Sequence, residues 1–98
     1  MKNLLNDAIQ EMVVRVNNEV NDMRDEVKAA DTRGHKIQIV DKRKAKVLRL
    51  FKKLNYLQEQ AVIRFGEDVE EDVNKLQKFE QRILIQIEDM YYIVNEAF

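Results

Sequence analysis

Few side chains in this 98-residue chain are of the types that carry out catalysis or bind metals. His35 is the only histidine, and there is neither a cysteine nor a serine. A cysteine or serine nucleophile is therefore excluded, and so is a zinc site built from several histidines and cysteines. The two glycines, Gly34 and Gly66, lie 32 residues apart, which excludes a glycine-rich phosphate-binding loop.

Carboxylates three residues apart on a helix can share a divalent cation. Glu19 with Asp22 and Glu67 with Glu70 have this spacing. Neither pair has an evident partner on a neighbouring segment, and the Glu-x-x-His motif of di-iron bundles is absent. We therefore expect no catalytic residue, no metal, no cofactor and no small-molecule substrate.

The charges are distributed unevenly, although the net charge is only −1. Residues 1–32 carry four basic and seven acidic side chains, residues 33–53 carry nine and one, and residues 67–98 carry three and nine. A basic central segment thus lies between two acidic ones. The preferred interpretation is that these opposite charges favour contacts between neighbouring segments of the same chain.

A second interpretation concerns a basic stripe on one side of the central segment. At helical spacing the stripe points away from the apolar residues, so it could meet nucleic-acid phosphates or an acidic partner. No aromatic residue is expected near it for base stacking. The stripe consists of Lys42, Lys46, Arg49, Lys53 and Arg64.

The C-terminal segment has more apolar residues than one core-facing stripe needs. Ile83, Ile87 and Val94 fall on the side that follows the apolar repeat, whereas Ile85 and Tyr92 fall on the opposite side. A helix that is apolar nearly all round is usually buried all round. We therefore expect a protein interface here, formed by Ile85, Tyr91, Tyr92, Ile93 and Phe98.

The absence of proline and the apolar spacing indicate helices that position these surfaces. We expect one domain, residues 1–98, with helices at about 3–32, 36–65 and 68–97. Asn3 is the expected N-cap of the first helix and Gly34 its expected C-terminal stop. Asp68 with Glu71 resembles a capping box at the start of the third.

The apolar residues of the outer segments recur every three or four positions. In the third segment seven of them share one heptad frame, which Glu80 alone interrupts. The two series are Leu5, Ile9, Met12, Val16, Val20, Met23, Val27 and Ala30, and then Val69, Val73, Leu76, Ile83, Ile87, Met90 and Val94.

Residues 37–40 are open to two interpretations. Their β-branched side chains are typical of a short strand, in which case Asp41 would cap a later helix. That helix would place Lys42, Arg43 and Lys44 at its positive end, which is unfavourable. We therefore prefer a helix from about residue 36.

These features predict an all-α protein, an antiparallel up-down-up three-helix bundle with coiled-coil-like packing that can dimerise. The predicted function is a non-catalytic protein–protein interaction module, such as an adaptor, a small regulator or an assembly chaperone. Its partner would be another protein or a second copy in a homodimer. The alternative is a nucleic-acid-binding regulator that uses the basic stripe. The lack of cysteine and of an apolar run long enough to span a membrane favours the cytoplasm and no membrane partner.

Overall fold

The computed structural model describes the backbone of residues 2–96 and the side chains of residues 5–95. Its elements are α1 (Lys2–Ala29), α2 (Arg33–Phe65), the short 3-10 helix η1 (Gly66–Val69) and α3 (Glu70–Glu96). No strand occurs within residues 2–96, so the all-α class is confirmed. The helical interpretation of residues 37–40 is also confirmed, because α2 runs through them.

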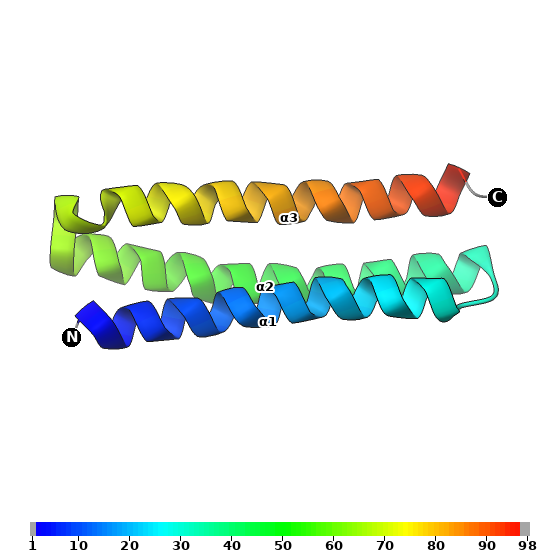
Figure 1. The fold of residues 1–98 in the computed structure, drawn as a ribbon, viewed down its shortest axis with the longest axis horizontal. Helices are drawn as coiled ribbons and strands as arrows, with labels where there is room; N and C mark the ends of the chain where they lie inside the picture. Colours follow the sequence, from blue (N-terminus) through cyan, green and yellow to red (C-terminus); the bar gives the residue numbers. More distant parts are fainter. Residues whose placement is uncertain (1, 97–98) are drawn as a thin grey trace.

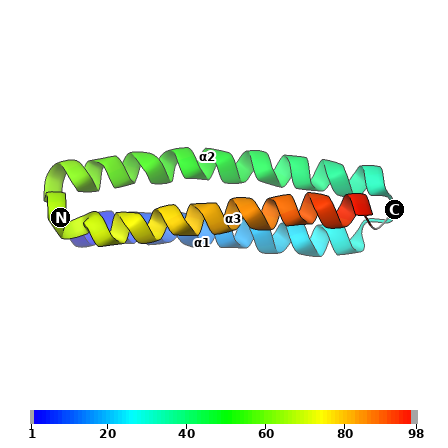
Figure 2. The ribbon, with the colours of Figure 1, turned by 90° about the horizontal axis from the view of Figure 1, so that it is seen from above.

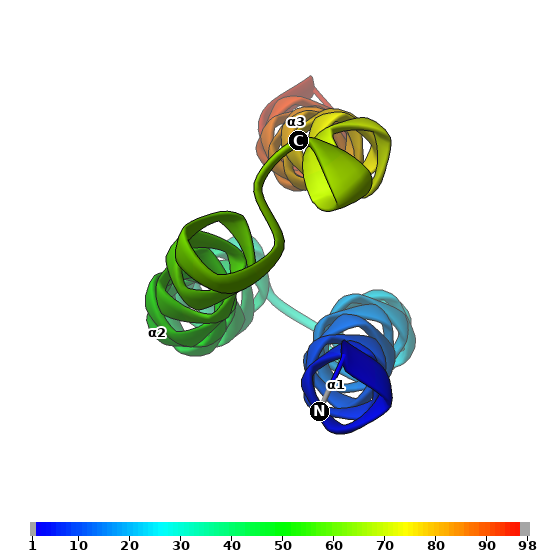
Figure 3. The same ribbon diagram turned by 90° about the vertical axis from the view of Figure 1, so that its left-hand side faces the viewer.

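The three α-helices lie antiparallel to their neighbours in the chain (Figure 1). α2 contacts both other helices, whereas α1 and α3 touch little and stand apart in the view along the rod (Figure 3). Since η1 joins α2 to α3 without a break, the backbone forms two long helical stretches, of which the second is bent at Gly66. The all-α fold is therefore not clearly the three-helix bundle that the sequence predicts.

The molecule is a narrow rod, as both side views show (Figures 1 and 2). It measures 49 × 19 × 15 Å, and its radius of gyration is 15.7 Å, against about 13 Å for a compact chain of this length. Its accessible surface is 6707 Å², where roughly 5,900 Å² is typical of this mass. The fold therefore has a thin core and an unusually large surface.

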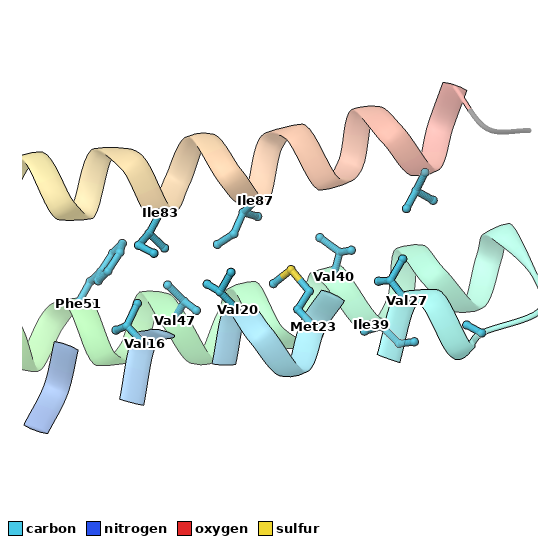
Figure 4. Packing of buried hydrophobic residues seen from close by; sticks show 12 residues of the cluster. Val16, Val20, Met23, Val27, Ile39, Val40, Val47, Phe51, Ile83 and Ile87 are labelled. Carbon is cyan, nitrogen blue, oxygen red and sulfur yellow. The ribbon is translucent and has the colours of Figure 1, made fainter. Parts of the chain in front are cut away.

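The apolar series predicted from the sequence form that core. Every member of both series is buried or half-buried in the structure. Figure 4 shows the larger of two clusters, in which Val20 and Met23 of α1 meet Val47 of α2 and Ile87 of α3. A smaller cluster around Ile9, Met12 and Leu54 lies toward the start of α1. Burial of each such side chain stabilises the fold by about 1.5–3 kcal/mol.

Glu80, which interrupts the apolar repeat of α3, has a partner on α2. The amide Nε2 of buried Gln58 donates a hydrogen bond of 3.2 Å to Oε1 of Glu80. Partial burial raises the pKa of Glu80, and this hydrogen bond partly opposes the shift. A polar pair inside an apolar layer disfavours other registers, because a shift along the helix would leave both groups without a partner.

The predicted helix ends are less accurate than the helices themselves. Asn3 lies inside α1 rather than capping it, and α1 ends at Ala29, well before Gly34. Gly34 falls in the first turn of α2, whose N-cap is Thr32, with Oγ1 accepting a hydrogen bond of 3.1 Å from the His35 backbone N–H. Asp68 lies within η1, so α3 begins at Glu70 and not at residue 68. The expected end at residue 97 lies outside the described residues.

Gly66 ends α2 and allows the chain to turn back. Its φ of 57° and ψ of −126° are disfavoured for residues with a Cβ. Its N–H donates to the carbonyl of Val62, which satisfies one of the open acceptors at the helix end.

We expect the two glycines to respond oppositely to replacement by alanine. A Cβ at either position meets no atom within 4 Å, so backbone conformation decides the outcome. Gly66→Ala should lower the free energy of unfolding by about 1–2 kcal/mol, whereas Gly34→Ala in a helical turn should raise it by about 0.4–1 kcal/mol. Urea unfolding followed by circular dichroism measures both. Equal effects at the two positions would contradict the assigned bend.

Candidate interaction surfaces

α3 presents large apolar side chains to solvent. Ile85, Tyr92 and Ile93 are 57%, 67% and 59% exposed. The opposite side of the same helix is already packed, because Ile83 and Ile87 are buried in the main core. The structure thus places three of the five predicted interface residues on an unoccupied surface, here called the α3 face.

Tyr91 has a different environment from its neighbours. Its side chain packs against the core, and its hydroxyl donates a hydrogen bond to the carboxylate of Asp41 on α2. Lys44 Nζ lies 5.6 Å from the centre of the ring. Burial, followed by the contact with Asp41, raises the pKa of Tyr91 to about 12. Tyr91 therefore attaches α3 to α2. Phe98, the remaining predicted interface residue, lies outside the described residues.

Four large apolar residues of α2 are exposed and were not singled out in the sequence: Leu48, Tyr56, Val62 and Ile63. Tyr56 is 60% exposed and Ile63 is 75% exposed. They lie seven residues apart, like Ile85 and Tyr92, and that spacing was the available signal. Tyr56 and Ile63 therefore provide a comparison for the α3 face.

The basic stripe lies beside a groove between α1 and α2. Lys46, Arg49 and Lys53 join Arg15 of α1 around a hollow of about 530 Å³. The structure leaves Lys42 and Arg64 exposed outside this hollow. The groove therefore gathers three of the five predicted stripe residues together with a cation from α1.

An adjoining hollow of about 430 Å³ extends the groove toward the start of α1. It shares Lys53 with the first hollow, and its lining includes Tyr56 and Leu57. The expectation that no aromatic residue lies near the stripe is therefore wrong. Tyr56 lies seven residues after Arg49 and therefore close to it on the helical wheel of α2, so the spacing was an available signal.

Arg43 is the charged residue at the centre of the α1–α2 contact. Its Nη1 lies 2.7 Å from Oε2 of Glu19 and 3.8 Å from Oδ2 of Asp22, and its Nη2 pairs with Glu26. The side chain is only 16% exposed. Sequence reasoning placed Arg43 among the other basic residues, although its position four residues after Ile39 puts it on the apolar side of α2.

This network supports the interpretation that opposite charges bind the segments of one chain together. The hydrogen bond from Arg43 lowers the pKa of Glu26, and the bonds to Glu26 and Glu19 raise the pKa of Arg43. Arg43 Nε is buried and has no hydrogen-bond partner among the described residues. Glu19 and Asp22, considered above as a cation-binding pair, both face this guanidinium instead.

The described residues contain no group of three or more His, Cys, Asp or Glu side chains that could hold a metal ion. Over the same part of the chain, no helix combines the length and apolar character that crossing a membrane requires. His35 is exposed at the start of α2. The predicted interface and stripe residues gather at two surfaces, the α3 face and the α1–α2 groove.

Comparison of the chain with family models, with curated proteins and with solved structures found no match.

Replacing Arg43 by methionine should destabilise the protein by about 2 kcal/mol, because three carboxylates lose a largely buried hydrogen-bonding cation. Arg15→Met is the matched control, since Arg15 forms one exposed pair with Glu11; its cost should be below about 0.5 kcal/mol. Urea unfolding measures both.

The pH dependence provides a second readout of the same substitution. The pKa of Glu26 is lowered in the folded protein, so its contribution is present above its ordinary pKa and is lost as the pH falls. The difference in unfolding free energy between the wild type and Arg43→Met should therefore shrink in acid. If the difference in unfolding free energy stays constant from neutral to acidic pH, the contribution of Glu26 to the effect of Arg43 is contradicted.

Proposed function

We propose that this protein is a non-catalytic helical interaction module that binds another protein, or a second copy of itself, through the α3 face. The observation that carries the proposal is the exposure of Ile85, Tyr92 and Ile93 on a helix whose other side is already packed. Aromatic and large aliphatic side chains on one exposed surface are characteristic of protein interfaces. An adaptor, a small regulator or an assembly chaperone would use such a surface.

The area and arrangement of the helices support this proposal. The chain exposes 6707 Å², which exceeds the typical value for its mass by roughly 800 Å². That excess is about the area that one partner buries in an interface of standard size. In the proposed assembly the three helices act as one antiparallel up-down-up bundle, whose packing is completed on the outside of α3 by the partner.

Ile85→Glu combined with Tyr92→Lys should abolish association while leaving the fold intact, because both side chains point away from the core. Light scattering after size exclusion would report a shift toward the monomer mass of 11.7 kDa, if the partner is a second copy. If the partner is another protein, a pull-down from cell extract would lose it.

The matched control is Ile63→Glu combined with Tyr56→Lys, which changes the same residue types at the same spacing on α2. This control should retain the association. If neither the oligomeric state nor the captured partner changes in the α3 variant, the proposal is rejected. If only the α2 variant loses association, the binding surface lies on α2.

A second candidate function is supported by the groove between α1 and α2. Arg49, Lys52 and Lys53 have no hydrogen-bond or ion-pair partner within the described part of the chain. Tyr56 lines the same groove, and half-buried Leu57 provides an apolar surface beside it. Cations along a groove together with an exposed aromatic ring are the features that bind single-stranded nucleic acid.

Arg49→Glu with Lys53→Glu should weaken the binding of a labelled single strand by at least about tenfold, and Tyr56→Ala by about tenfold through lost base stacking. Fluorescence anisotropy over a salt series measures both. Lys28→Glu with Lys75→Glu makes the same charge change on exposed residues outside the groove and should have little effect. Equal weakening by both double variants, or binding that ignores salt, would reject this candidate.

A further inference from the structure

The α3 face contains a symmetric row of residues centred on Ile85. Its members lie three, four or seven residues on either side of Ile85, and all of them are exposed. At 100° per residue these spacings place the whole row on one side of the helix. The row consists of Lys78, Gln81, Arg82, Ile85, Glu88, Asp89 and Tyr92.

The charges of this row change sign at its centre. Lys78 and Arg82 precede Ile85, and Glu88 and Asp89 follow it. None of these four side chains has a hydrogen-bond or ion-pair partner among the described residues. The α3 face is therefore positive on one side of Ile85 and negative on the other, with its charges available to a partner.

A row of this kind is complementary to itself when two copies lie antiparallel. Residues on the same flank of the row, at similar distances on opposite sides of Ile85, then face each other across the two helices. Arg82, three residues before the centre, meets Asp89 of the other copy, four residues after it, and Gln81 meets Glu88 in the same way on the other flank. Lys78 meets Tyr92 at seven residues, a pairing that suits a cation and an aromatic ring.

A parallel arrangement in the same register would bring like charges together. Glu88 would face Asp89 of the other copy on both flanks, and Arg82 would face Gln81 instead of a carboxylate. Charge pairs that are exposed contribute little affinity, but they select between orientations. Ile85 and Tyr92 supply the apolar contact, and the charges determine its direction.

We propose that the partner of the α3 face is a second copy of this chain, with the two α3 helices antiparallel and a twofold axis passing between the Ile85 side chains. This inference rests on the proposed function of the α3 face. Such a contact is isologous, so it closes as a dimer and does not propagate into a filament. From Lys78 to Tyr92 it extends about 21 Å along the helix at 1.5 Å per residue.

The decisive experiment uses two charge-reversal variants of the full chain, Arg82→Glu and Asp89→Arg. Each variant alone places two like-charged pairs across its own dimer, and should raise the dimer dissociation constant by about tenfold or more. In a one-to-one mixture, both pairs across a mixed dimer join opposite charges, so a heterodimer should form. Sedimentation equilibrium or native mass spectrometry, with one variant carrying a mass label, measures this exchange.

The combined variant Arg82→Glu with Asp89→Arg restores both charge pairs and should dimerise like the wild type. Lys52→Glu on α2 is the control for a single charge reversal and should leave the dimer unchanged. Weakened dimerisation that neither mixing nor the combined variant restores would overturn the antiparallel pairing. Charge reversals that leave the dimer dissociation constant unchanged would also overturn the antiparallel pairing.

These outcomes separate the pairing from the proposed function. A dimer that depends on Ile85 and Tyr92 but ignores the charge exchange would retain the α3 face as an interface and reject the antiparallel arrangement. A wild-type chain that stays monomeric at every concentration would also reject the pairing. In that case, capture of another protein that is lost with Ile85→Glu and Tyr92→Lys would still support the proposed function.

Discussion

The fold depends on α2 serving as the packing partner of two helices at once. Because α1 and α3 touch little, each buries its apolar stripe mainly against α2. α2 therefore places apolar residues on two adjoining sides, with Ile39 and Leu50 among its contacts in the core. Apart from Arg43, most of its charged residues lie on the remaining surface, and this arrangement produces the basic stripe.

Polar contacts then determine how each outer helix is aligned on α2. Arg43 pairs with three carboxylates of α1, and these contacts are lost if the two helices slide by one turn. On the other side of α2, Gln58 donates a hydrogen bond to Glu80, and Tyr91 donates one to Asp41. These two contacts lie at separate points along α3. Apolar packing alone tolerates several registers, whereas a buried polar group without its partner costs about 1–3 kcal/mol. The charge alternation between segments thus has a structural role within one chain.

The sequence predicts the parts of this structure that depend on apolar periodicity. Both apolar series point inward as expected, because burial is the largest favourable contribution to folding. Helix ends are harder to predict, since the Thr32 cap rests on a single hydrogen bond worth about 1 kcal/mol. Competing signals for a helix end, such as Gly34, have free-energy effects of similar size. The separation of α1 from α3 has no local signal, because it depends on how three helices cross.

The candidate surfaces likewise include some features that the sequence predicts and others that it does not. Exposure of Ile85 and Tyr92 follows from the wheel of one helix, and the structure places them as expected. The groove beside Lys53 and Tyr56 belongs to two helices, so no pattern within α2 reveals it. Arg43 was concealed in a basic run, although its spacing from Ile39 shows that it faces inward. Features of single helices are therefore predictable here, and features that form between helices require the structure.

The weak attachment of α3 has a consequence for binding. Toward its start, Val73, Leu76 and Phe79 are only half-buried, and α1 adds little contact along the helix. A partner on the proposed α3 interface would bind the folded helix and not the unfolded chain, so it would stabilise the fold by mass action. The stabilisation would be greatest for the element with the fewest contacts of its own, because that element opens most readily. The proposed association through α3 would therefore be coupled to the order of α3 on α2.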